Sequence, residues 1–175
     1  LKIPARFICA NVLQLPEALT GQFDIVFASY GVLHWLNDLR RWGEVIAHFL
    51  KPGGIFYIVE DHPFMRVFKS DAAAELRPLR SYFFSPEPQK LEAKGSYATN
   101  DEGQSRTYHI WDHSLGEIIN ALISAGLQIE FLHEFPYAAR AKFPGMEKGS
   151  DNWWRLSQQH GSLPFLFSLQ ARKPY

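Results

Sequence analysis

The sequence contains one cysteine among its 175 residues. No internal disulfide can form, and a lone Cys9 fits a reducing compartment, so we expect a cytoplasmic protein. Long apolar runs are also absent, since none approaches the roughly 20 residues that a helix needs to cross a bilayer. The sequence therefore predicts no contact with a membrane.

Net charge is lacking as well, because 18 lysines and arginines balance 18 aspartates and glutamates. Such a chain has no general attraction to nucleic acid, and we predict none as a partner. No cysteine cluster is present and His62 has no histidine partner at helical spacing, so we predict no metal site. The hydrophobic fraction of 46% is enough for the core of one soluble domain.

The clearest pattern in the sequence is strand, helix, strand. Runs of β-branched and aromatic residues at 23–28 and 55–60 predict two buried strands. Between them, residues 36–50 carry apolar side chains at spacings of three and four, which indicates a helix with one core-facing stripe. Two such strands joined by a helix form a βαβ unit in a parallel sheet. Ligands of these sheets bind beyond the carboxyl ends of the strands, here residues 28–31 and 60–63.

Other elements are predicted from helix-capping residues, from glycine and proline, and from alternation of apolar and polar side chains. Asn37 or Asp38 is expected to cap the first helix, and Asp112 or Ser114 the second. The remaining predicted elements are a strand at 5–10, a turn at 51–54, a helix ending at Gly126, and strands at 107–110, 127–134 and 164–172. We expect the last two strands to pair as an antiparallel hairpin.

Three segments resemble a known family. FDIVFASYGVLHWL and LKPGGIFYIVE resemble the centre of class I S-adenosylmethionine-dependent methyltransferases, and CANVLQLP at 9–16 resembles the segment beside the adenine in that family. The resemblance covers residues 5–62, and residues 114–173 fit the family's last helix and closing hairpin more loosely. It implies an α/β fold with a partial Rossmann-like methyltransferase sheet, whose parallel strands are closed by an antiparallel hairpin. It also implies S-adenosylmethionine as the cofactor.

The sequence departs from the family at its beginning. The family's glycine-rich turn after the first strand, and the acidic residue that ends the second, are not found here. We therefore expect residues 1–175 to form a single, N-terminally incomplete methyltransferase domain. If the family's strand order holds, the strand at 23–28 becomes an exposed apolar edge, which favours pairing with another chain. We expect residues 5–10 to pack elsewhere, or a homodimer to form through this edge.

Two long segments interrupt the regular pattern. Residues 63–110 and 136–161 are rich in proline and aromatic side chains and are too long for plain connections. We interpret both as insertions that cap the site as a substrate lid.

The resemblance implies a set of cofactor contacts. Asn11 and Val12 would flank the adenine, with Asn11 in place of the usual acid, since its carbonyl can still accept a hydrogen bond. Ser29, Tyr30 and Gly31 would lie beside the methionine part of the cofactor. The alternative is structural: Asn11 would close an Asx turn, and residues 29–31 a strand-to-helix turn.

Two residues are candidate proton acceptors, and others are candidate substrate contacts. His34 is one candidate, since an unperturbed imidazole titrates near 6.5, and Glu60 is the other, since it ends a strand where a general base would lie. The alternatives are a packed histidine and the start of a solvated loop. Candidate substrate-binding residues are Trp35, His62, Tyr82, Tyr108, Trp111 and Trp153. The alternative for the aromatic ones is that they form the core of the cap.

The function that these features predict is methyl transfer from S-adenosylmethionine to a small-molecule acceptor by in-line displacement. One alternative is a non-catalytic fragment or interaction module that binds no cofactor alone. A second is a nucleotide-dependent oxidoreductase on a similar sheet, although that class also needs the missing glycine-rich turn.

Overall fold

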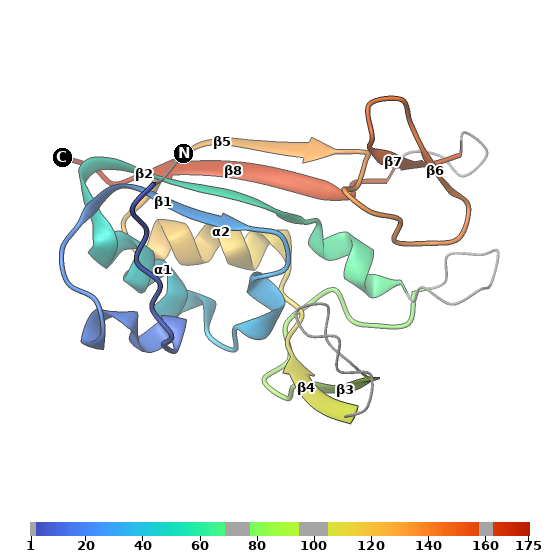
Figure 1. The fold of residues 1–175 in the computed structure, drawn as a ribbon, viewed down its shortest axis with the longest axis horizontal. Coiled ribbons are helices and arrows are strands. Elements are labelled where there is room, and N and C mark those ends of the chain that lie inside the picture. The colour runs from blue at the N-terminus through green and yellow to red at the C-terminus, as the bar shows by residue number, and fades with distance from the viewer. Residues whose placement is uncertain (1–2, 69–77, 95–104, 158–162) are drawn as a thin grey trace.

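A four-stranded sheet organises the molecule (Figure 1). The computed structural model describes residues 3–68, 78–94, 105–157 and 163–175. The strands are β1 (Phe23–Ser29), β2 (Leu50–Asp61), β5 (Gln128–Phe135) and β8 (Leu166–Arg172), in the order β1-β2-β8-β5. β1 and β2 are parallel, whereas β8 is antiparallel to both β2 and β5. The predicted parallel unit and closing hairpin are confirmed.

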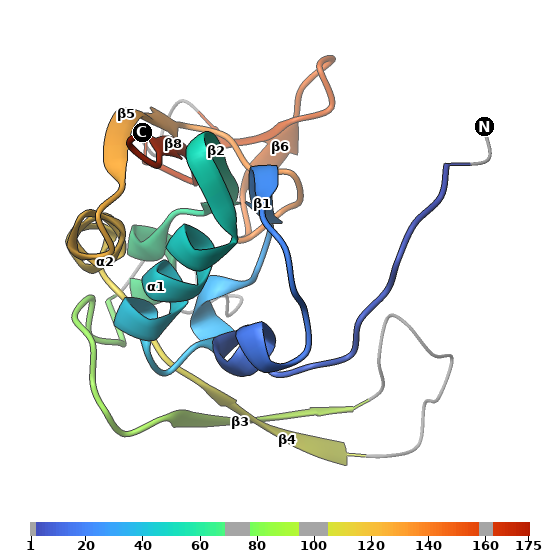
Figure 2. The ribbon, with the colours of Figure 1, turned by 90° about the vertical axis from the view of Figure 1, so that its left-hand side faces the viewer.

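Both long helices cover the same face of the sheet (Figures 1 and 2). α1 (Leu39–Phe49) begins at Asp38, whose side chain accepts a hydrogen bond from Arg41 N–H. α2 (Leu115–Ser124) begins at Ser114, which forms a reciprocal capping box with Glu117. Gly126 ends α2 with a φ of 83°. The predicted helices therefore form where local capping and breaking signals place them.

The core lies between these helices and the sheet. Trp42 of α1 packs edge-on against Phe56 of β2, with ring centroids 5.5 Å apart. Leu122 of α2 and Leu169 of β8 are fully buried in the same cluster. The alternation of buried and half-buried residues along β2 follows from this one-sided packing, because successive side chains point to opposite faces.

The opposite face of the sheet carries aromatic side chains. Phe27 stacks on Tyr57 with centroids 6.1 Å apart, and Tyr57 meets Phe131 edge-on at 6.3 Å. Ile25 and Phe27 remain 61% and 60% exposed. Among the residues that the structure describes, no helix covers this face, and β1 pairs only with β2. The strand at 23–28 is thus the exposed apolar edge that we expected.

Two predictions about the first half of the chain are wrong. Residues 3–10 pair with no strand in the described part of the chain, and Phe7 is 94% exposed. An extended segment becomes a strand only when a neighbour accepts its backbone hydrogen bonds. The turn predicted at 51–54 lies inside β2, which begins at Leu50 and contains an irregular register near Gly53, with a φ of 76°.

Short elements complete the chain. The 3-10 helices are η1 (Val12–Glu17), η2 (Leu33–Trp35) and η3 (Pro63–Val67). Two separate hairpins are formed by β3 (Gln89–Lys94) with β4 (Ser105–Ile110) and by β6 (Met146–Lys148) with β7 (Trp154–Leu156).

The segments predicted to cap the site, 63–110 and 136–161, contain η3 and both hairpins. Residues 69–77, 95–104 and 158–161 of these segments lie outside the described residues. In Figure 1 the hairpins lie toward the end of the sheet where β2 leads into η3. Their role as a lid stays a prediction. No helix in the described residues is long and apolar enough to cross a membrane.

Candidate functional site

Two adjoining cavities lie beyond the carboxyl ends of β1 and β2. Each has a volume of about 440 Å³. The first, here the Tyr30 cavity, is lined by Tyr30, Gly31 and Trp35, and the second, here the Phe143 cavity, by Met65, Phe68 and Phe143. Both are also lined by His34, Asp61, Arg140 and Lys142. The site therefore lies at the strand ends where parallel sheets bind ligands.

Glu60 holds the loop that borders the Tyr30 cavity. Its Oε1 accepts a hydrogen bond from Gly31 N–H at 2.5 Å, and its Oε2 accepts one from Val32 N–H at 2.7 Å. Oε1 also accepts from Asp61 N–H at 2.8 Å. The glutamate is 3% exposed. This geometry favours a positioning role for Glu60 over the general-base role that the sequence suggested.

The loop held by Glu60 has an unusual backbone. Tyr30 has a φ of 45° and Gly31 a φ of 90°. A left-handed tyrosine is uncommon and is maintained only when surrounding contacts fix it. Two N–H groups pulled toward one carboxylate provide that constraint. The consequence is a side-chain-free backbone at Gly31 facing the cavity.

His34 lies where the two cavities meet. Burial, and secondarily the positive charge of Arg66, lowers the pKa of His34 to about 4. The imidazole is therefore neutral near pH 7 and can accept a hydrogen bond, although it binds a proton only weakly.

Acid should destabilise the folded chain through its buried histidines. Burial also lowers the pKa values of His62 and His113. Unfolded histidine titrates near 6.5 and folded His34 at about 4, so the unfolded state binds more protons between these pH values. We expect the free energy of unfolding to rise with pH across this range, measured by urea denaturation at pH 4.5–7. His34→Gln should reduce that slope by up to about 1.4 kcal/mol per pH unit, and an unchanged slope would contradict the assignment.

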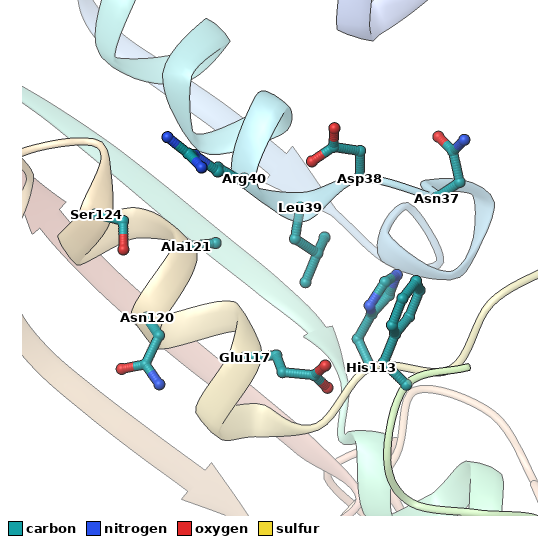
Figure 3. Close-up of a pocket in the computed structure, with 10 residues that line it drawn as sticks. Asn37, Asp38, Leu39, Arg40, His113, Glu117, Asn120, Ala121 and Ser124 are labelled. Atoms are coloured by element: carbon teal, nitrogen blue, oxygen red, sulfur yellow. The ribbon is translucent and has the colours of Figure 1, made fainter. Parts of the chain in front are cut away.

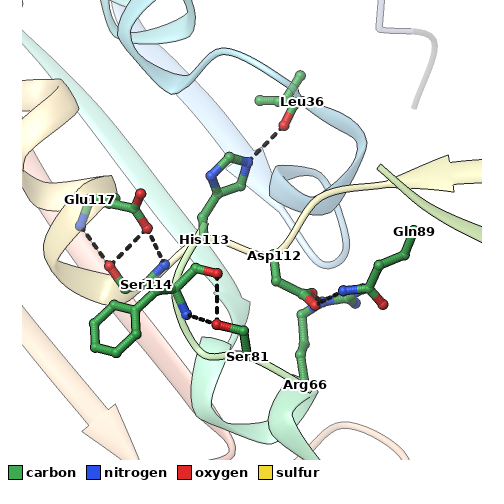
Figure 4. Close-up of polar contacts among 9 residues, drawn as sticks. Leu36, Arg66, Ser81, Gln89, Asp112, His113, Ser114 and Glu117 are labelled. Atoms are coloured by element: carbon green, nitrogen blue, oxygen red, sulfur yellow. Dashed lines mark hydrogen bonds and ion pairs between the residues drawn. The ribbon is translucent and has the colours of Figure 1, made fainter. Parts of the chain in front are cut away.

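Cationic side chains around the Phe143 cavity are functional candidates that sequence reasoning missed. Arg66 Nε donates to Asp112 Oδ1 at 2.5 Å, and Gln89 donates to the same carboxylate (Figure 4). Lys142 forms an ion pair with Asp61 at the end of β2. These pairs join residues 46 and 81 positions apart in the sequence. No local pattern signals such convergence, so only the folded chain reveals it.

A further cavity of about 320 Å³ lies between α1 and α2 (Figure 3). Asn37 and Asp38 border it from the start of α1, and Asn120 and Ser124 from α2. This cavity lies on the helical side of the molecule, and no residue at the end of a strand lines it. We therefore assign the site to the Tyr30 and Phe143 cavities. In the described part of the chain, no group of three or more metal-binding side chains comes together.

Comparisons with known proteins point to one fold. A family model for a methyltransferase domain matches residues 1–58. A candidate S-adenosylmethionine-dependent methyltransferase from Listeria monocytogenes is 16% identical with a TM-score of 0.53, over 88% of this chain and 62% of that chain. One from Mesorhizobium loti is 19% identical with a TM-score of 0.53, over 94% and 68%. One from Clostridium acetobutylicum is 10% identical with a TM-score of 0.57, over 99% and 66%.

The chain has a class I methyltransferase fold. It spans between 62% and 68% of the length of these three structures. A comparison with curated proteins gave no match. The predicted fold class is confirmed, and within this methyltransferase fold the predicted site residues can now be placed.

Two residues that the methyltransferase resemblance places beside the adenine lie away from both cavities. Asn11 caps η1, with its side-chain oxygen accepting from Leu13 N–H at 3.0 Å. Val12 packs against the main core. Their contact with a cofactor stays a prediction. Ser29, which is half-buried, ends β1 next to the Tyr30–Gly31 loop.

The predicted substrate contacts divide into two groups. Trp35 lines the Tyr30 cavity and packs edge-on against Tyr108 at 5.6 Å. Trp111 borders a small cavity beside His34 and donates its indole N–H to Pro86 O at 3.2 Å. These three aromatic residues lie within reach of the site.

The other three predicted residues make contacts within the protein, and their contact with a substrate stays a prediction. The Tyr82 hydroxyl accepts from Leu115 N–H at 3.1 Å, which ties it to the start of α2. Trp153 packs on Tyr137, with ring centroids 4.8 Å apart.

His62 is 4% exposed, and its Nδ1 accepts a hydrogen bond from Phe64 N–H at 3.1 Å. Its Nε2 lies 2.8 Å from a Glu134 oxygen, outside the geometry of a directed hydrogen bond. His62 thus caps η3 and faces the interior.

Proposed function

We propose that the chain takes part in S-adenosylmethionine-dependent methyl transfer to a small-molecule acceptor by in-line displacement. The observation that carries the proposal is the Glu60-held loop, which presents the bare backbone of Gly31 to a cavity at the end of β1. The fold and the family match over residues 1–58 support it.

The Tyr30 cavity fits the amino-acid end of this cofactor. Asp61 offers a carboxylate for the ammonium group of the cofactor. The half-exposed aromatic ring of Tyr30 suits a sulfonium cation. When bound, S-adenosylmethionine supplies an electrophilic methyl group on a positively charged sulfur.

The residues between the cavities would serve alignment more than proton abstraction. Holding a nucleophile in line with the reacting carbon supplies a large part of the rate in such displacements. His34, neutral and placed between the cavities, can orient an acceptor by accepting a hydrogen bond. Its weak basicity favours acceptors that need no strong base.

Gly31→Ala tests the proposal. A Cβ at Gly31 would face the cavity on a backbone with φ of 90°, 3.5 Å from His34 Cε1. The left-handed conformation costs an L-residue about 1–2 kcal/mol, so the loop should relax and block the backbone surface. We expect binding of S-adenosylhomocysteine, measured by calorimetric titration, to weaken at least tenfold.

Gly21→Ala is the matched control. Gly21 has a φ of 95° and open space around it, so the backbone strain is similar, but it precedes β1 at the opposite end of the strand. This variant should lose a similar amount of stability and bind S-adenosylhomocysteine like the wild type. Absence of binding by the wild-type chain would argue instead for the non-catalytic module.

We propose further that a second copy of the chain pairs through β1. The exposed side chains of Ile25 and Phe27 lie on this edge strand, and a free edge is a template for another strand. Sedimentation velocity at micromolar concentration should show a dimer. A single monomeric species would contradict this pairing.

A further inference from the structure

Positive charge gathers in the Phe143 cavity. Four cationic side chains line it, and Asp61 is the one carboxylate among its described lining residues. Two of the cations, Arg66 and Lys142, are already paired with Asp112 and Asp61. The other two are Arg80 and Arg140, and neither has a carboxylate partner among the residues that the structure describes.

Arg80 is fixed in place by its backbone. The N–H groups of Leu79 and Arg80 both donate to Val67 O, at 2.8 and 3.2 Å. The preceding Pro78 forms a β-bridge with Phe68. These contacts hold residues 78–80 against residues 67–68 at the wall of the cavity, where Arg80 is half-buried.

Arg140 reaches the same cavity from a segment 60 residues further along the chain. Before it, Ala138 exchanges two backbone hydrogen bonds with Trp154, at 2.8 and 2.9 Å. After it, Lys142 is tied to Asp61 at the end of β2. Arg140 is therefore held between two anchors, although its own side chain is exposed to solvent.

Apolar side chains complete the cavity. Met65 is 5% exposed and Phe143 is 7% exposed, and Phe68 packs edge-on against Phe143 at 6.2 Å. A ligand that matches this lining has an apolar body and an anionic end. The volume of about 440 Å³ is within the usual range of about 300–1,000 Å³ for small-molecule sites.

We propose that the Phe143 cavity binds an acceptor that carries a carboxylate, with Arg80 and Arg140 as the groups that hold it. This inference rests on the proposed function and names the substrate class of the same site. A guanidinium presents a planar fork of N–H donors that matches the two oxygens of a carboxylate. The hydrocarbon part of the acceptor packs against Phe68 and Phe143, which leaves its remainder free to extend toward His34.

The experiment titrates 3-phenylpropionate into the chain without any cofactor, followed by nuclear magnetic resonance chemical shifts. 3-Phenylpropionamide is the neutral probe of the same shape. We expect the acid to bind at least tenfold more tightly than the amide. The double variant Arg80→Gln/Arg140→Gln should weaken binding of the acid at least tenfold and leave binding of the amide unchanged.

Arg40→Gln is the control for general charge. Arg40 is an exposed arginine on α1 whose only described ion pair is a surface contact with Glu44 at 3.6 Å. This variant changes the net charge by one unit away from the Phe143 cavity, so it should bind the acid like the wild type. An equal loss in Arg40→Gln would mean that general charge attracts the acid, which would overturn the site.

Other outcomes decide the inference independently of the enzyme class. Equal binding of acid and amide by the wild type overturns it without any variant. If phenyl phosphate binds more than tenfold more tightly than the acid, the assignment of a carboxylate ligand is wrong and a phosphate ligand is favoured. A chain that binds S-adenosylhomocysteine but not the acid keeps the proposed function and loses this inference. Binding of the acid alone supports the anion site and leaves the methyl transfer unsupported.

Discussion

Replacing Glu60 with alanine should lower the free energy of unfolding by about 3 kcal/mol. The buried carboxylate accepts hydrogen bonds from three backbone N–H groups, those of Gly31, Val32 and Asp61. Hydrogen bonds to a charged acceptor contribute about 1.5–3 kcal/mol each, and donors left without an acceptor add a penalty. Rehydration of the loop offsets part of that loss, so the expected value is below the sum. Urea denaturation measures it.

Two further variants separate the role of Glu60 from general effects. Glu60→Gln keeps the shape but presents an NH₂ group to one of the N–H donors, so an intermediate loss is expected. Glu44→Ala removes a half-exposed carboxylate from the surface of α1, where ion pairs contribute about 0–1 kcal/mol. The order of loss should therefore be Glu60→Ala, Glu60→Gln, Glu44→Ala. A loss at Glu60 no larger than at Glu44 would show that the loop does not depend on the carboxylate.

Replacing Gly43 with alanine should destabilise the chain, although the same change usually stabilises a helix. A Cβ at Gly43 would lie 2.7 Å from the carbonyl oxygen of Ala121 and 3.4 Å from the Cβ of Ala125. The contacting atom at 2.7 Å belongs to the backbone of α2 and cannot rotate away. α1 and α2 must therefore separate, and overpacking of this kind costs about 1–3 kcal/mol. Thermal and urea denaturation should both report the loss.

Gly116→Ala is the control, because this substitution is expected to raise the free energy of unfolding. Gly116 is exposed near the start of α2, and a Cβ there would meet only Ser114 Oγ, at 3.9 Å. Alanine at an unobstructed helical position gains about 0.5–1 kcal/mol from reduced backbone entropy in the unfolded chain. Stabilisation by both substitutions would show that the two helices are not in close contact at Gly43.

Features encoded over short stretches were predictable from the sequence. The βαβ unit follows from apolar periodicity, and α2 follows from Ser114, Glu117 and Gly126, whose cap and stop lie within one segment. The antiparallel closure of β5 and β8 was also expected, because both segments alternate and the family resemblance supplied their pairing.

Features that depend on distant partners were not predictable. The segment 5–10 has the composition of a strand but no neighbour in the described structure. The sequence places Glu60 at the end of a strand, which the structure shows. The orientation of its side chain was not predictable, because its partners Gly31 and Val32 are 29 and 28 positions away. His62 lies beside Glu134 of β5 and packs edge-on against Phe167 of β8, so its orientation also depends on residues far along the chain.

The uncovered face of the sheet contributes to a large accessible surface, and that surface has a consequence for the thermodynamics of unfolding. The accessible surface is 11445 Å² for a chain of 20.1 kDa, whereas a folded monomer of that mass exposes roughly 8,700 Å². Less surface is therefore exposed on unfolding than in a typical domain. Because both the heat-capacity change and the denaturant dependence scale with that newly exposed surface, both should be small for a chain of this length. Its stability curve should accordingly be flat, with a broad thermal transition, until a second layer covers the aromatic face.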